Sequence, residues 1–351
     1  MPLKRRDFLV RAIAGTSLSS LGGCFLFAEP GRLQVAALGG GFPPKLLDQF
    51  KQQHQKAAEF KPARNYEELW DRVKSGKDLP DLIGLGDSWL DRAIAANLIA
   101  SWPKQNIHQI FPQWQELLPV FQATATRGDR VWGIPYRWGT TVIAYRRDRV
   151  AAPLTHWQDL WRPELQGKII LPQNCREVVG IILKKLGYSY QTSDLSLVPE
   201  LEQQLKTLHQ QVKTYSNQYY LQPLITGSCW VSVGWTTDLV RTQQLYPNLQ
   251  IVVPREGSAI WTDIWMVTKS TRNRALAEVW QNFFLQPAIA TQVTALTNAP
   301  ATIATPKDLP QTVQQDQFKS LDPAVFAKCE PLLPLPIKTA NQYNQIWQSL
   351  S

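Results

Sequence analysis

The segment SAIWTDIWMV (residues 258–267) places one aspartate between two tryptophans in an otherwise apolar run. Its β-branched and aromatic residues predict a β-strand. Because side chains alternate along a strand, we expect Trp261, Asp263 and Trp265 on one face. A carboxylate flanked by indole rings suits an organic cation, since the ring faces attract ammonium and the carboxylate neutralises it. The alternative is a core strand whose aspartate caps a neighbouring backbone amide.

Further predicted strands and helices alternate along the chain on both sides of this segment. Strands are expected at Arg32–Leu38, 81–86, 139–147, 167–172, 229–235 and 249–254, and helices near 43–56, 65–76, 88–98, 176–186, 199–213 and 273–285. This alternation predicts an α/β fold with largely parallel sheets. A chain of 351 residues is long enough for one large or two medium domains.

The first 24 residues have the pattern of an export signal rather than of a folded element. Arg5 and Arg6 precede a modestly apolar stretch that ends in LGGC, residues 21–24. This pattern is typical of a bacterial twin-arginine signal joined to a lipoprotein cleavage box, with Cys24 as the lipidated residue. We therefore expect an exported, periplasmic protein that is anchored to a membrane through lipid. A Sec signal cleaved elsewhere, or an uncleaved anchor, is the alternative, and both also lead to export.

Composition and spacing argue against nucleic-acid binding, metal binding and covalent catalysis. Removal of residues 1–23 takes away four basic residues and one acidic residue and lowers the formal charge from +9 to +6, and the remaining Lys and Arg are dispersed. The four histidines stand alone, and neither a nucleophile elbow nor a phosphate loop is present. We predict no catalytic residue, no cofactor and no metal site. Cys175, Cys229 and Cys329 lack metal spacing but would allow one disulfide, for instance between Cys175 and Cys229.

Tryptophans at expected strand ends favour a binding protein. Trp138 stands at the beginning of the strand in IPYRWGTTVIAY, and Trp235 in VGWTTD stands where a strand turns into a helix. Open α/β sheets bind ligands in the crevice at strand ends. Packing in the core is the alternative for each tryptophan.

Six segments, in sequence order, resemble the periplasmic spermidine/putrescine-binding proteins of ABC importers. They are IPYRWGTTVIAY, WQDLWRPELQGKI, REVVGIILKKLGYS, VGWTTD, VVPREGSAIWTDIWMV and NFFLQPAIATQV, and the W-x-D-L-W-x-P-E…G-K run is the most specific. The resemblance extends from about Leu33 to the C-terminus. It implies an α/β, two-lobed periplasmic binding protein fold (type II) with a ligand cleft between the lobes and no enzymatic activity. Lobe 1 would comprise residues 32–137 and 264–310, and lobe 2 residues 138–263 and 311–351.

The same resemblance implies a polyamine site between the lobes. Trp261 and Asp263 would lie beside a ligand ammonium where the chain crosses from one lobe to the other. Motif matches assign Trp235 as an aromatic wall and Glu177 as a second anion. A flexible polycation needs carboxylates at intervals and aromatic walls along its methylenes. The expected function is therefore a monomeric solute-binding protein that delivers a spermidine- or putrescine-like cation to a membrane permease.

Several positions depart from the family pattern, and part of the expected cation site lacks charge. Asn174 stands where the family has an aspartate, and Gly86 and Ser88 stand where it has a serine and a tyrosine. Three glycines replace a loop that carries an aromatic, a hydroxyl and a glutamate. Glycines ahead of a helix expose backbone N–H groups, which suit an anion. The alternative ligand is a zwitterionic ω-amino acid with its carboxylate near Gly40 and Gly41, and the alternative class is a binding or sensory module with a vestigial pocket.

Overall fold

The computed structural model describes residues 31–76, 79–297, 299–303 and 322–348, and every structural statement below concerns them. The expected export signal and Cys24 lie outside these ranges. The strands are β1 (Arg32–Leu38), β2 (Ala57–Ala63), β3 (Leu82–Gly86), β4 (Trp102–Pro103), β5 (Thr126–Arg127), β6 (Arg130–Val131), β7 (Ile134–Arg146), β8 (Ile169–Leu171), β9 (Val212–Tyr215), β10 (Val231–Trp235), β11 (Leu249–Val252), β12 (Ala259–Val267) and β13 (Glu330–Pro331).

Helices connect most of these strands. The α-helices are α1 (Pro44–His54), α2 (Tyr66–Lys74), α3 (Leu90–Ala95), α4 (Ile107–Ile110), α5 (Pro119–Ala125), α6 (Cys175–Lys185), α7 (Leu201–Gln211), α8 (Leu221–Thr226), α9 (Thr236–Leu245), α10 (Arg274–Phe284), α11 (Pro287–Leu296), α13 (Pro323–Phe326) and α14 (Ile337–Gln348). Short 3₁₀ helices are η1 (Gly39–Gly41), η2 (Asp87–Trp89), η3 (Lys104–Asn106), η4 (Pro112–Glu116), η5 (Trp157–Trp161), η6 (Pro163–Leu165) and η7 (Leu195–Leu197).

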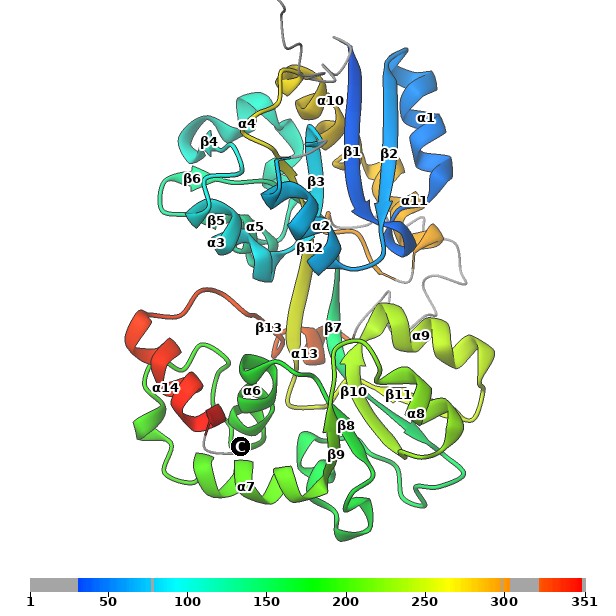
Figure 1. Cartoon of the computed structure of the whole chain (residues 1–351), viewed down its shortest axis with the longest axis vertical. Coiled ribbons are helices and arrows are strands. Elements are labelled where there is room, and N and C mark those ends of the chain that lie inside the picture. Colours follow the sequence, from blue (N-terminus) through cyan, green and yellow to red (C-terminus); the bar gives the residue numbers. More distant parts are fainter. Residues whose placement is uncertain (1–30, 77–78, 298, 304–321, 349–351) are drawn as a thin grey trace, which may run out of the picture.

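The chain forms two lobes, and β7 and β12 run from one to the other (Figure 1). A mixed sheet continues through both lobes in the order β2-β1-β3-β12-β7-β10-β8-β9, with β11 on β7 and β13 on β12. The outer strands are parallel, since β1 pairs in parallel with β2 and β3, and β8 with β9 and β10. By contrast, β7 and β12 are antiparallel to each other and to β10 and β3, respectively. The predicted α/β, two-lobed fold is therefore confirmed.

Each lobe has its own hydrophobic core. The core of the first lobe contains buried residues from Leu33 to Tyr136 and from Ile264 to Ile303. Trp265 lies within it, stacked on Tyr136 with ring centroids 4.5 Å apart. The main core of the second lobe contains buried residues between positions 143 and 233 together with Tyr343 of α14. This distribution supports the proposed lobe boundaries near residues 137/138 and 263/264, which remain a prediction.

The two crossing strands pair with each other at the point where they leave the first lobe. Asp263 of β12 lies opposite Arg137 of β7, but Ile264 lies opposite Pro135, so the register shifts by one residue between them. Such a β-bulge bends a strand and redirects its side chains. On its other edge β12 pairs with β3, where Asp263 lies opposite Gly86. The crossing therefore brings Asp263 and Arg137 together at the boundary between the lobes.

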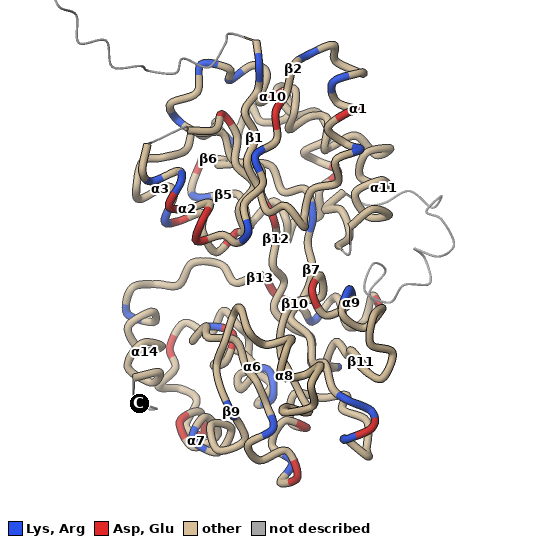
Figure 2. Tube along the Cα trace, turned by 45° about the vertical axis from the view of Figure 1, so that its right-hand side comes forward, with Lys and Arg blue, Asp and Glu red and all other residues tan. Residues whose placement is uncertain are grey.

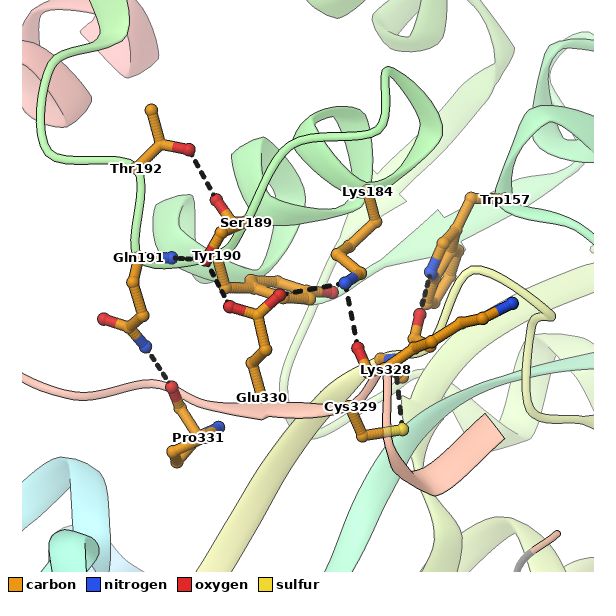
Figure 3. Close-up of polar contacts among 12 residues, drawn as sticks. Trp157, Lys184, Ser189, Tyr190, Gln191, Thr192, Lys328, Cys329, Glu330 and Pro331 are labelled. Carbon is orange, nitrogen blue, oxygen red and sulfur yellow. Dashed lines mark hydrogen bonds and ion pairs between the residues drawn. The ribbon is translucent and has the colours of Figure 1, made fainter. Parts of the chain in front are cut away.

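The C-terminal segment is attached to the second lobe by β13 and by polar contacts around it (Figure 3). Lys184 of α6 lies 2.9 Å from Glu330 Oε1 and donates a hydrogen bond of 2.9 Å to the carbonyl of Lys328. The hydroxyl of Ser189 donates to Glu330, and the side-chain amide of Gln191 donates to the carbonyl of Pro331. These contacts join the end of the chain to the second lobe.

One strand was not predicted from the sequence, and the disulfide that the sequence left open is not formed. The strand β2 (Ala57–Ala63) was not predicted, because its sequence AAEFKPA contains two charged residues and a proline. An edge strand tolerates such residues. The suggested disulfide does not form, since Cys175, Cys229 and Cys329 are all free thiols. Cys175 instead lies 3.1 Å from the carbonyl of Tyr343, and Cys229 packs in a core.

Candidate functional site

The predicted site residues come from both lobes and from the strands that join them. Gly40, Gly41 and Ser88 belong to the first lobe, Asn174, Glu177 and Trp235 to the second, and Trp261 and Asp263 to β12.

Glu177 is a buried carboxylate in the first turn of α6 and is 4% exposed. The hydroxyl of Thr141, on β7, lies 3.0 and 2.9 Å from its two carboxylate oxygens. Burial raises the pKa of Glu177 to about 7, although hydrogen bonds from Thr141 and Trp235 and the charge of Arg176 oppose this shift. In the described part of the chain, no Lys or Arg forms an ion pair with Glu177. A cation bound beside this carboxylate would favour its ionised form.

Asn174 positions Glu177 instead of supplying a second charge. It is the N-cap of α6, and its side-chain oxygen accepts hydrogen bonds from the backbone N–H groups of Arg176 at 3.0 Å and Glu177 at 3.4 Å. An asparagine in this position stabilises the start of a helix. The guanidinium of Arg176 donates to the carbonyls of Leu333 and Tyr190 and forms no ion pair with Glu177 within the described residues.

Two half-buried tryptophans lie on the strands around Glu177. Trp235 ends β10 and packs edge-on against Tyr220, with ring centroids 5.7 Å apart. Trp261 donates its indole N–H to the carbonyl of Thr140 at 3.4 Å. Its ring fills the space beside Gly139, where an added Cβ would lie 2.1 Å from the Trp261 ring. Both indoles are therefore held in fixed positions while retaining some exposed surface.

Asp263 already has a cationic partner. Nε of Arg137 lies 2.6 Å from Oδ2 of Asp263, Nη2 lies 2.6 Å from the same oxygen, and the hydroxyl of Tyr66 donates to Oδ1. The Arg137 and Asp263 side chains are only 6% and 3% exposed. Burial alone would lower the pKa of Arg137, but the Asp263 carboxylate raises it above its usual range. The partners of Asp263 are therefore side chains and not a backbone amide, as the core-strand alternative had it. Its role as a partner of a ligand ammonium stays a prediction, and Arg137 already pairs with the same carboxylate.

The guanidinium of Arg137 lies against the glycine loop. A Cβ added to Gly41 would lie 2.1 Å from Nη2 and 2.6 Å from Cζ of Arg137, whereas one added to Gly40 would meet nothing within 4 Å. Gly41 is buried and Gly40 is exposed. The glycines form the separate turn η1, and α1 begins only at Pro44. A side chain at position 41 would therefore displace Arg137, which explains why a glycine is needed there.

Asp87 is a second carboxylate with a raised pKa at the boundary between the lobes. Burial, and then the charge of Asp263, raise its pKa to about 7, while hydrogen bonds from the backbone N–H groups of Thr262 and Ser88 oppose the shift. The charge of Asp87 also acts to raise the pKa of Arg176, which belongs to the second lobe, although burial lowers that pKa overall. Ser88 itself is exposed.

Arg137, Tyr66, Asp87 and Thr141 were missed in the sequence analysis. Arg137 had a usable signal, because a single cation inside the otherwise apolar strand IPYRWGTTVIAY needs a buried partner. Tyr66 had no such signal in the sequence, because it lies 197 positions away from Asp263, its hydrogen-bond partner. Its place follows only from the pairing of β3 with β12.

Residues of both charges are spread over the described part of the chain. In the view of Figure 2, Lys and Arg alternate with Asp and Glu over both lobes. Within the described ranges, no group of His, Cys, Asp and Glu is arranged to hold a metal ion. No helix in that part of the chain is both long and apolar enough to cross a bilayer.

Known proteins resemble this chain in both sequence and fold. Residues 77–329 match the family model described as bacterial extracellular solute-binding protein. The spermidine/putrescine-binding periplasmic protein of Salmonella typhimurium is 28% identical over 294 residues, 82% of each chain. That of Escherichia coli is 27% identical over 253 residues, 72% of each chain. The solved structure of the spermidine/putrescine ABC transporter substrate-binding protein PotD from Streptococcus pneumoniae matches with a TM-score of 0.76 at 22% identity, covering 91% of this chain and 98% of that chain.

Proposed function

The chain belongs to the bacterial extracellular solute-binding protein family, and on this basis we propose that it binds a small organic amine between its lobes and delivers it to an ABC importer permease. It performs no covalent chemistry in this role. It acts as an exported monomer, held at the membrane by lipid on Cys24.

The buried carboxylate of Glu177 is the main support for this proposal. A carboxylate that is 4% exposed and lacks an ion-pair partner among the described residues is costly to ionise, and its raised pKa expresses that cost. An ammonium placed between this carboxylate and the indole of Trp235 would offset the cost, because both groups attract cations. Neutral and anionic solutes offer no such compensation.

Closure of the lobes would couple binding to transport. The strands β7 and β12 connect the lobes, and a bend at these strands would bring α6 of the second lobe toward η2 of the first. The ligand would favour the closed state because it contacts groups of both lobes only in that state. The permease would then recognise the closed, loaded form.

Polyamines are the first ligand class to consider, because the curated relatives are named as spermidine/putrescine-binding proteins. A diamine would place one ammonium at Glu177 and the other near the carboxylates of the first lobe, Asp263 or Asp87. Trp261 would cover the methylenes between them.

A zwitterionic ω-amino acid is the second candidate, and the position of Arg137 favours it. The guanidinium lies against Gly41, beside which the carboxylate of such a ligand is expected from the sequence.

Thermal unfolding with a panel of ligands tests the proposal. Putrescine, spermidine and γ-aminobutyrate are added to the mature protein, and a ligand present at about 100 times its Kd should stabilise it by about 2.7 kcal/mol. The Glu177→Gln variant should lose the response. Glu202→Gln, which changes an exposed glutamate in the first turn of α7, serves as the matched control and should keep it. If no amine stabilises the wild type, the protein is instead a binding or sensory module with a vestigial pocket.

A further inference from the structure

We propose that Arg137 determines the ligand specificity of this site: its guanidinium occupies the position of a ligand ammonium at Asp263, so that the site accepts a solute with a single ammonium. This inference rests on the proposed function, since it concerns which amines the same site takes.

The geometry makes Arg137 a permanent counter-ion of Asp263. Two nitrogens of the guanidinium lie 2.6 Å from Oδ2, and Tyr66 donates to Oδ1, so each carboxylate oxygen has a donor from the protein itself. Both side chains are more than nine-tenths buried. A second ammonium would have to displace the guanidinium from this carboxylate or approach it as a like charge, and both are unfavourable in a desolvated site.

The surroundings of Arg137 are built to hold it in this place. The register shift between Asp263 and Ile264 of β12 leaves Arg137 directly opposite Asp263. Gly41 provides the space for the guanidinium, because any Cβ there would overlap it. The loop, the bulge and the ion pair thus form one arrangement, and that arrangement removes one negative charge from the amine site.

Glu177 is then the carboxylate that remains for a ligand cation. It accepts from the hydroxyl of Thr141 and from the indole of Trp235 and has no ion-pair partner in the ranges that the structure describes. Asp87 differs, because two backbone N–H groups, those of Ser88 and Thr262, already hold its carboxylate against β12. With Asp263 paired to Arg137 and Asp87 bound by backbone N–H groups, the proposed site takes one ammonium, at Glu177.

Two four-carbon amines test the role of Arg137 directly. Putrescine and n-butylamine share a four-carbon chain and one ammonium, and they differ in whether the fourth carbon carries a second ammonium or only hydrogen. Calorimetric titration of the mature protein gives the ratio of their Kd values. In wild type, putrescine should bind no more tightly than n-butylamine. In Arg137→Met, putrescine should gain about tenfold or more in affinity relative to n-butylamine, since a tenfold change in Kd is about 1.4 kcal/mol.

Three further variants separate charge from folding. Arg137→Gln also removes the charge but keeps a hydrogen-bond donor for Asp263, so it provides the same test if Arg137→Met does not fold. Arg137→Lys keeps the charge and should keep the wild-type ratio. The double variant Arg137→Met/Asp263→Asn removes both charges and should show no gain for putrescine.

The outcomes distinguish this inference from the proposed function. If both amines bind but the ratio is the same in wild type, Arg137→Met and Arg137→Gln, the inference is wrong and the proposed function stands. If putrescine binds only when Arg137 is replaced, the inference holds. If neither amine binds to wild type or to any Arg137 variant, both fail.

Discussion

Lowering the pH should release an amine from this protein, because protonation of Glu177 removes the charge that holds it. Burial raises the pKa of Glu177 to about 7. The protonated carboxyl is therefore the favoured form below that pH, and only the ionised form attracts an ammonium. For a group with this pKa, the ionised fraction falls from about 90% at pH 8 to about 1% at pH 5. Affinity should fall about 90-fold over this interval, or about 2.7 kcal/mol at 1.36 kcal/mol per unit.

Other groups near Glu177 do not produce the same profile. Thr141 and Trp235 are neutral, Arg176 stays charged, and burial holds the pKa of Tyr190 well above its ordinary value. Ligand amines also stay charged, since a primary ammonium has a pKa of about 10. Asp87 is the exception, because its pKa is also raised to about 7. The variant Asp87→Asn therefore isolates the contribution of Glu177.

Calorimetric titration between pH 5 and pH 8 measures this dependence. The ligand is the amine that gives the largest stabilisation in the thermal panel. Titrations in two buffers with different ionisation enthalpies should also show a proton released on binding near pH 7. Glu177→Gln should bind weakly, and when it is combined with Asp87→Asn its pH profile should be flat. A wild-type affinity that changes less than twofold between pH 8 and pH 5 would refute the role of Glu177.

Three further predictions concern stability and anchoring. Gly41→Ala should destabilise the protein by about 1–3 kcal/mol in urea unfolding because its Cβ overlaps Arg137, whereas Gly40→Ala should be nearly neutral; equal effects would contradict the packing. Asp263→Asn should cost about 3–5 kcal/mol, because it leaves the buried guanidinium of Arg137 unpaired; an unchanged urea midpoint would show that the pair is not formed in solution. Cys24→Ser should abolish incorporation of labelled fatty acid in the bacterial host and release the protein from membranes, and unchanged labelling would exclude Cys24 as the lipidated residue.

The fold could be predicted from local patterns because its strands and helices obey simple periodicities. β1 extends over Arg32–Leu38 as expected, and α2 begins after Asn65, whose side chain accepts from the N–H of Glu68 at 2.8 Å. The prediction failed at β2, an edge strand without an apolar pattern. The order of the strands was not predicted, because pairing between distant segments leaves no local signal.

The site could be predicted in its parts but not in its connections. Glu177 and Trp235 were both named from the sequence as ligand contacts, which stays a prediction, and the structure places the indole of Trp235 within hydrogen-bonding reach of the Glu177 carboxylate. The pairing of Asp263 with Arg137 was missed, because the two positions are 126 residues apart and meet through the register of β7 and β12. Trp138, the neighbour of Arg137, was instead singled out in the sequence analysis as a binding residue, although Trp138 packs in a small core cluster.

A crystal structure of the protein with its tightest-binding amine tests the central claim most directly. We predict a ligand nitrogen within about 4 Å of the Glu177 carboxylate, the ion-pair limit, beside the ring of Trp235 and with the Arg137–Asp263 pair intact. A ligand that binds outside the region between the lobes, or that turns its carboxylate or carbon chain toward Glu177, would contradict the account.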